Sequence, residues 1–282
     1  MSIKIATPFK VAGIAAAAVV ALGLAVPTTA SAAPVHSTPA RAKPTVVLVH
    51  GAWADASSFA PVTAELQRDG YTVLNAPNPL RDLDTDAANV AAFINQNTTG
   101  PVVLVGHSYG GAVITEAASE TPSVKALVYV DAYAPDQGES AIQLTGAQPG
   151  SLLAVPDPTT VFNFVQYPGA TNGDVDTYIK PSLFQKIFAA GLPAKQANVL
   201  AASQSPIALG ALKDTESAVP AWKTIKSYFF IGTNDKVIPA AEQLAMAQRA
   251  NGVVVTAKAD HLSMLEVPDR VTNFIEKAAT GK

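Results

Sequence analysis

A serine flanked by glycines near the middle of the chain has the residue types and spacing that nucleophilic catalysis requires. The segment GHSYG at 106–110 follows an apolar run at 102–105 and precedes a run of small residues. A strand, a G-x-S-x-G turn and a helix in succession are typical of a nucleophile elbow, a tight and strained turn that presents the serine hydroxyl clear of a sheet. The pattern predicts a nucleophile at Ser108, against the alternative of a Gly-Ser turn with no chemistry.

Four histidines are candidates for the base that must take the proton of this serine. His36 lies in a proline-rich segment with no fixed neighbours, and His107 sits beside the serine, where its side chain must point elsewhere. His50 ends an apolar run ahead of the serine. His261 lies in the segment KADHLSML after the last apolar run, where a loop side chain can reach over the carboxyl edge of a sheet. The chain order serine, acid, histidine also favours His261 as the base.

Two aspartates between Ser108 and His261 have the right placement for the acid that fixes the imidazole tautomer. Asp235 follows an apolar run in GTNDKVIP, and Asp131 ends another in VYVDAYAP. We favour Asp235, because its loop is the usual site of this residue in proteins with a nucleophile elbow. The alternatives are that Asp131 is the acid and that Asp235 is a turn residue of an Asn-Asp pair.

A tetrahedral oxyanion requires two hydrogen-bond donors near the serine. The backbone N–H of Tyr109, the residue after the nucleophile, is one expected donor. The second is expected from the loop HGAW at 50–53, whose glycine permits a close backbone turn, and we select the N–H of Ala52. We interpret His50 in this loop as a structural hydrogen-bonding residue, because the base is already assigned.

Six apolar runs alternate with amphipathic segments along the rest of the chain. Runs that are apolar on both faces are typical of parallel strands covered by helices on both sides. The intervening segments carry apolar residues at helical spacing, and this alternation implies right-handed crossovers. We therefore predict an α/β fold with a doubly wound, mainly parallel six-stranded sheet. The predicted strands are at 45–51, 72–77, 101–108, 124–132, 227–233 and 252–257.

One interval, 133–226, interrupts this alternation. It holds many prolines and several short helical patterns, such as PSLFQKIFAA at 181–190, and shows no convincing strand. We predict a mostly helical cap over the carboxyl edge of the sheet, inserted into a core formed by 45–132 and 227–282. The phenylalanines and tyrosines of this insertion either form its own small core or line a pocket.

The first 32 residues have the composition of a secretory signal peptide. Two lysines precede an apolar stretch at 11–26, which is shorter than the ~20 residues that a spanning helix needs. The pattern ASA predicts cleavage after Ala32, with cleavage after Ala33 and a retained membrane anchor as alternatives. The proline-rich residues 33–44 predict a flexible lead-in.

Composition narrows the classes of partner. The chain has no cysteine, which excludes disulfides and a lipid anchor on an N-terminal cysteine. The net charge of -3 and the 15% of charged residues suggest no nucleic-acid partner. No cluster of metal ligands and no phosphate-binding glycine loop is visible, so we predict no metal site. The mature protein is expected to be exported and soluble, with no stable membrane association.

Four segments together resemble the α/β-hydrolase superfamily, namely VVLVHGA, GHSYGGAV, NDKVIP and ADHLSML. The likeness is greatest to the compact branch that contains plant methyl-ester esterases, hydroxynitrile lyases and many bacterial esterases, and it covers nearly all of the mature chain outside the insertion. The resemblance implies a six-stranded parallel core with a helical cap and no cofactor. It places the nucleophile, acid and base at Ser108, Asp235 and His261, and the oxyanion donors at Ala52 and Tyr109.

Departures from related enzymes narrow the expected chemistry. The hydroxynitrile lyases have a lysine that handles cyanide after the histidine, where this chain has Leu262, so lyase activity is not expected. Dehalogenases and epoxide hydrolases of the superfamily use an aspartate nucleophile, where this chain has Ser108, so their reactions are not expected either. We expect a secreted serine carboxylesterase that hydrolyses small-molecule esters in a small apolar pocket, through an acyl-enzyme. The alternatives are a lactone or C–C bond hydrolase with the same residues and a small-molecule receptor, and the oligomeric state stays open.

Overall fold

The computed structural model of the protein describes residues 42–281. The predicted signal peptide and residues 33–41 of the predicted lead-in lie outside the described residues. Within residues 42–281, no helix has both the length and the apolar character needed to cross a membrane.

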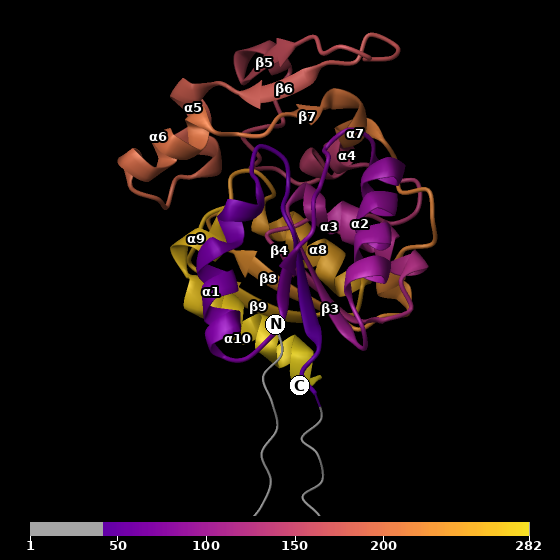
Figure 1. Ribbon diagram of the computed structural model, residues 1–282. Coiled ribbons are helices and arrows are strands. Elements are labelled where there is room, and N and C mark those ends of the chain that lie inside the picture. Colours follow the sequence, from indigo (N-terminus) through magenta and orange to yellow (C-terminus); the bar gives the residue numbers. More distant parts are fainter. Residues whose placement is uncertain (1–41, 282) are drawn as a thin grey trace, which may run out of the picture. The chain divides into compact units, whose positions relative to one another are not determined.

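All six predicted strands are present and form one parallel sheet (Figure 1). They are β1 (Thr45–Val49), β2 (Val73–Asn75), β3 (Val102–His107), β4 (Val124–Val130), β8 (Ser227–Gly232) and β9 (Val253–Ala257). Their order is β2-β1-β3-β4-β8-β9, so the chain winds outward in both directions from β1 and β3. Both β3 and β8 are buried along their whole length, which explains their continuous apolar composition.

Helices cover both faces of this sheet (Figure 1). They are α1 (Ala60–Arg68), α2 (Leu83–Asn97), α3 (Tyr109–Ala117), α8 (Ala240–Arg249), α9 (Ser263–Glu266) and α10 (Pro268–Thr280), with 3-10 turns at Ala56–Phe59, Ala118–Glu120 and Ala221–Lys223. On one face α1 packs against α10, and on the other α2 packs against α3. The predicted doubly wound α/β fold is therefore confirmed.

The insertion at 133–226 contains an antiparallel sheet of three short strands, β5 (Phe162–Val165), β6 (Asp176–Ile179) and β7 (Ile207–Ala208). Its helices are α4 (Ala141–Thr145), α5 (Pro181–Phe188), α6 (Ala194–Ala202) and α7 (Leu209–Lys213), with a 3-10 turn at Pro158–Thr160. The prediction of a helical cap is confirmed, but the expectation that the insertion contains no strand is wrong. Strands of four, four and two residues are too short for an alternating pattern to stand out in the sequence.

The insertion covers the carboxyl ends of the parallel strands as a cap (Figure 1). Arg81, in the loop after β2, pairs with Asp176 of β6 at 2.6 Å and donates to the carbonyl of Pro206 at 3.2 Å. The N–H of Ala208 in β7 donates to the carbonyl of Leu80 at 3.0 Å. These contacts fix the cap sheet to the core loop beside the carboxyl edge, which is where the predicted site residues gather.

Candidate active site

Ser108 lies at the turn between β3 and α3, where the sequence predicts a nucleophile elbow. Its backbone has φ 53° and ψ −125°, a conformation that costs a residue other than glycine about 1–3 kcal/mol. A Cβ at Gly106 would lie 2.5 Å from the carbonyl oxygen of Gly110, and a Cβ at Gly110 would lie 2.5 Å from that of Val49. The turn therefore needs glycine on both sides of the serine.

The structure brings the three predicted side chains into one hydrogen-bonded chain. His261 Nε2 is 2.9 Å from Ser108 Oγ, and His261 Nδ1 is 2.8 Å from Asp235 Oδ2. All three residues are buried. With its proton on Nδ1, the imidazole donates to the carboxylate, and Nε2 accepts from the serine hydroxyl. This arrangement can remove the hydroxyl proton and stabilise the imidazolium that results.

Asp235 accepts hydrogen bonds from three donors besides His261. Its Oδ1 accepts from the backbone N–H of Val237 at 2.7 Å and of Ile238 at 3.0 Å, and its Oδ2 accepts from the side-chain amide of Gln243 at 2.9 Å. Burial raises the pKa of Asp235, and these donors oppose the rise by favouring the charged form. They also hold the carboxylate in its orientation toward the imidazole.

Asp131, the alternative acid, faces a different set of donors. It accepts from the N–H of Gly232 at 2.6 Å and from the N–H of Ser263 at 3.3 Å. Burial and the nearby carboxylate of Asp235 raise the pKa of Asp131. The structure thus places Asp235, and not Asp131, against His261. Asp131 instead ties the end of β8 to the loop that carries the histidine.

Two aromatic rings pack against His261. Its ring centroid lies 4.8 Å from that of His107 and 5.0 Å from that of Phe188 in the cap helix α5. His107 Nε2 donates to the backbone carbonyl of His261 at 2.9 Å, so His107 holds the histidine loop. Burial lowers the pKa of His261, which keeps the imidazole neutral and able to accept a proton.

The two predicted oxyanion donors flank the serine. Ala52 lies in the turn after β1, Tyr109 begins α3, and both line the same cavity as Ser108. A Cβ at Gly51 would lie 2.6 Å from the Cβ of Ser108, so only glycine lets this turn approach the serine so closely. No hydrogen bond within residues 42–281 uses the backbone N–H of Ala52 or of Tyr109, so both remain available to a ligand.

His50 supports this turn. Its Nδ1 donates to the carbonyl of Gly51 at 3.0 Å, and its own carbonyl accepts from the amide of Asn78 at 2.8 Å. Burial lowers the pKa of His50, so it is a neutral residue of the loop. In the part of the chain that the structure describes, no group of three or more His, Cys, Asp or Glu side chains is arranged to hold a metal ion.

A cavity of about 490 Å³ opens at Ser108 between the core and the cap. Three of the cap aromatics, Tyr133, Phe162 and Phe164, line it, and Lys213 adds a charged group to an otherwise mainly apolar wall. A cavity of this volume accommodates a ligand of drug size. It is larger than the small apolar pocket predicted from the sequence.

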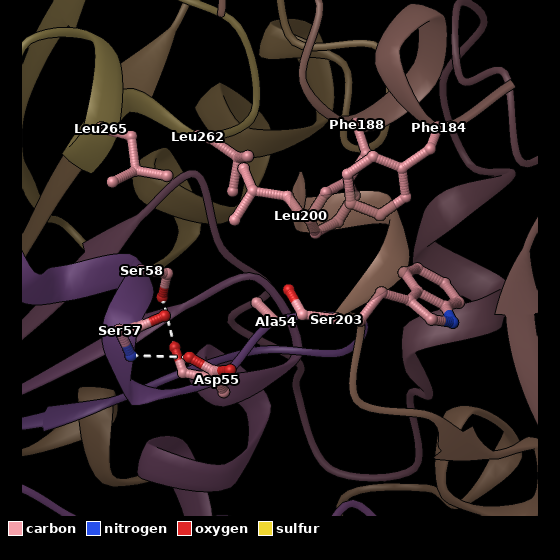
Figure 2. Close-up of a pocket in the computed structure, with 11 residues that line it drawn as sticks. Ala54, Asp55, Ser57, Ser58, Phe184, Phe188, Leu200, Ser203, Leu262 and Leu265 are labelled. Carbon is pink, nitrogen blue, oxygen red and sulfur yellow. Dashed lines mark hydrogen bonds between the residues drawn. The ribbon is translucent and has the colours of Figure 1, made fainter. Parts of the chain in front are cut away.

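A second and much smaller hollow lies beside the site, between the cap helices and the core (Figure 2). Figure 2 shows Phe184 and Phe188 from α5, Leu200 from α6, and Leu262 and Leu265 from the core gathered along one side of it. Its volume of about 10 Å³ gives room for about one water molecule. The cap aromatics therefore serve both purposes that the sequence left open: some line the cavity, and others pack the cap onto the core.

Sequence reasoning missed several residues that support this site. Gln243 lies on α8 eight positions after Asp235, and a glutamine on a helix carries no signal that it will bind a buried carboxylate. The sequence predicts only that the side chain of His107 points away from the serine, because the two residues are neighbours on the tight turn. The sequence did not show that it would reach the backbone of His261.

The comparison with known families agrees with this geometry. The profile of the alpha/beta hydrolase family matches residues 46–274. The chain belongs to the alpha/beta hydrolase family, and it is an enzyme of the hydrolase class.

Curated relatives include esterases and other hydrolases. A carbendazim-hydrolysing esterase from Nocardioides is 36% identical over 110 residues, which cover 35% of this chain and 46% of that protein. The alpha/beta hydrolase nvfD from Aspergillus novofumigatus is 28% identical over 263 residues, which cover 84% of this chain and 97% of that protein. The chain thus aligns with about half of the Nocardioides esterase and with nearly the whole of the fungal hydrolase.

Solved structures share the fold. Polyneuridine aldehyde esterase has a TM-score of 0.70 at 18% identity, with 84% of this chain and 99% of that chain covered. A methylesterase from Arabidopsis has a TM-score of 0.67 at 17% identity, with 85% of this chain and 100% of that chain covered. The resemblance to the branch with the plant methyl-ester esterases is therefore confirmed for the fold.

Proposed function

We propose that the protein is a serine carboxylesterase that hydrolyses small-molecule esters through an acyl-enzyme. The observation that carries the proposal is the hydrogen-bonded chain from Ser108 through His261 to Asp235. Its serine faces a cavity that the residues of the two expected oxyanion donors, Ala52 and Tyr109, also line. An acyl transfer needs a nucleophile, a base with its orienting acid and an oxyanion site. The esterase among the curated relatives supports the choice of ester over other acyl bonds.

The first half of the reaction forms the acyl-enzyme. Nε2 of His261 takes the hydroxyl proton of Ser108 as Oγ attacks the ester carbonyl carbon. The carbonyl oxygen becomes an oxyanion and accepts hydrogen bonds from the N–H groups of Ala52 and Tyr109. The imidazolium, stabilised by Asp235, then protonates the alcohol oxygen, and the C–O bond of the ester breaks.

The second half returns the free enzyme. A water molecule gives a proton to Nε2 of His261 and attacks the acyl carbon, and the oxyanion forms again at the same two donors. The intermediate then expels Oγ of Ser108, which takes the proton back from the imidazolium. The acid product leaves the cavity.

The size and lining of the cavity favour substrates whose acyl part is a bulky apolar or aromatic group. Its volume of about 490 Å³ and its wall of Trp53, Tyr133, Phe162 and Phe164 offer far more apolar surface than an acetyl group can bury. Within the small-molecule esters, the substrate class is therefore esters whose acyl part fills the cavity.

A panel of esters tests this function. We expect the purified protein to hydrolyse nitrophenyl esters, with kcat/KM rising from acetate to aromatic acyl groups, and to leave the matched amides intact. Ser108→Ala should lower turnover by at least about 10⁴-fold. Turnover retained by Ser108→Ala, or a preference for lactones or C–C bonds over every ester, would refute the proposal. Tight ligand binding with only a single slow turnover would favour a receptor instead.

We also propose that the protein is secreted after cleavage of residues 1–32. The apolar stretch followed by small residues supports this proposal. Its test is N-terminal sequencing of the protein collected from culture medium. The expected first residue is Ala33, or Pro34 for a cut one residue later. Protein that stays in the cell with Met1 still present would contradict export.

A further inference from the structure

Trp53, the residue after Ala52, has an unusual backbone conformation. Its φ is +55°, in the left-handed region that bulky side chains rarely adopt. Such a residue costs about 1–3 kcal/mol and persists only where its surroundings hold it in place. Because Trp53 directly follows the proposed oxyanion donor, whatever holds Trp53 also sets the position of the Ala52 N–H.

The surroundings that hold Trp53 belong mainly to the cap. Its indole Nε1 donates to the carbonyl of Thr177 in β6 at 3.0 Å and lies 3.3 Å from the hydroxyl of the same residue. The indole stacks on Phe162 of β5, with ring centroids 5.3 Å apart and an interplanar angle of 27°. The edge-on ring of Phe188 lies 6.0 Å away. These partners lie more than 100 residues further along the chain, so the strained turn depends on the docked cap.

We infer that Trp53 is a positioning residue through which the cap sets the oxyanion site. The indole bond to Thr177 keeps the turn at 51–53 in its strained form, and this form directs the N–H of Ala52 into the cavity beside that of Tyr109. The inference rests on the proposed function, since it assigns a role in stabilising the tetrahedral intermediate.

The size of the expected effect follows from the oxyanion site. Removing one oxyanion donor outright typically lowers turnover by about 10²- to 10³-fold. Loss of the indole bond leaves the donor in the chain but lets it shift, so the effect should be smaller. We expect Trp53→Phe to lower kcat by about 10- to 100-fold. With nitrophenyl acetate, whose acetyl group buries little of the wall that Trp53 helps to form, KM should stay within about threefold, because a donor aimed at the oxyanion acts mainly in the transition state.

Trp222 provides a matched control, because the chain contains only two tryptophans. It is also buried, and its Nε1 also donates to a backbone carbonyl, that of Pro135, at 2.9 Å. Trp222→Phe therefore removes the same kind of hydrogen bond outside the oxyanion turn. It should lower the thermal stability to a similar extent as Trp53→Phe and leave kcat within about twofold.

If Trp53 only stabilised the fold, Trp53→Phe would lower the thermal stability and nothing else. The second readout, which such a role would not change, is the affinity for phenylboronic acid. Its boron bonds to Oγ of Ser108, whose proton passes to Nε2 of His261, and the boron becomes tetrahedral and anionic like the intermediate. We expect Trp53→Phe to weaken this affinity by about the same factor as it lowers kcat, and Trp222→Phe to leave it unchanged. Unchanged boronate affinity and kcat in a folded Trp53→Phe protein would overturn the inference.

A second variant isolates the hydrogen bond from the shape of the ring. Replacing Trp53 with benzothienylalanine keeps the two fused rings and substitutes sulfur for the N–H group. We expect the same loss of kcat and of boronate affinity from this protein, and wild-type values from it would overturn the inference even if Trp53→Phe does not fold. If the wild-type protein neither hydrolyses esters nor binds the boronate, the proposed function has failed, and this outcome is visible before any variant is measured.

Discussion

Glu216 lies buried where the cap returns to the core. Backbone hydrogen bonds to Gly138 and Glu139 hold it in place, and its two carboxylate oxygens have no hydrogen-bond partner within residues 42–281. Its neighbours Glu116 of α3 and Asp84 of α2 are acids too. Burial and the charge of Glu116 raise the pKa of Glu216 to about 9. The folded protein therefore keeps Glu216 protonated at neutral pH.

The raised pKa sets both the sign and the size of an effect on stability. Below pH 4.5 both the folded and the unfolded state hold this proton, so the group does not lower the free energy of unfolding. As the pH rises from 4.5 toward 9, only the folded state keeps the proton, and the free energy of unfolding falls. At pH 7 the unfolded state gains up to about 3 kcal/mol over the folded state by ionising this one group. Glu216→Gln removes the ionisation, and its amide can donate to Glu116. We expect this variant to be more stable than wild type by about 1–3 kcal/mol at pH 7, with little difference near pH 4.5.

Urea unfolding measured at pH 5 and at pH 8 tests this expectation. Glu120, which is exposed at the end of the 3-10 turn Ala118–Glu120, provides the control, and Glu120→Gln should change the free energy of unfolding by less than about 0.5 kcal/mol. A Glu216→Gln protein that is destabilised equally at both values would refute the reasoning, because the side chain would then be charged and paired in the folded state.

Three further predictions concern the acid, the base and the turn that carries Ser108. Asp235→Asn should lower kcat by about 10⁴-fold and Asp131→Asn by far less, and the reverse order would make Asp131 the acid. Burial lowers the pKa of His261 to about 3, so kcat/KM should decline only well below pH 6.5 as the base becomes protonated; a midpoint at or above 6.5 would contradict this burial effect. Gly110→Ala should destabilise the fold by at least about 2 kcal/mol in urea unfolding, because its Cβ would meet the backbone of Val49 and His50; wild-type stability would show that the elbow can relax.

The parallel core could be predicted because its strands carry their own signal. A strand buried on both faces must be apolar throughout, so a run such as Val102–Val105 stands out from the amphipathic helices around it. The residues Ser108, Asp235 and His261 could be selected because each follows such a run and few residue types can perform each role.

The cap and the supports of the site could not be predicted in the same way. The strands of the cap are short and partly exposed, so pairing partners and not local pattern define them. Trp53 and Gln243 act through contacts with Thr177 and Asp235, and neither residue type is specific for its role. Their positions become informative only when the fold brings separate segments together.

The most direct test of the account is to find which residue becomes covalently modified by a fluorophosphonate, a reagent that captures activated serines. We expect one adduct per chain, located by peptide mass spectrometry on Ser108, with labelling abolished in Ser108→Ala and strongly slowed in Asp235→Asn. An adduct on another residue, or none in a protein that still hydrolyses esters, would contradict the claim that Ser108, His261 and Asp235 act as one catalytic unit.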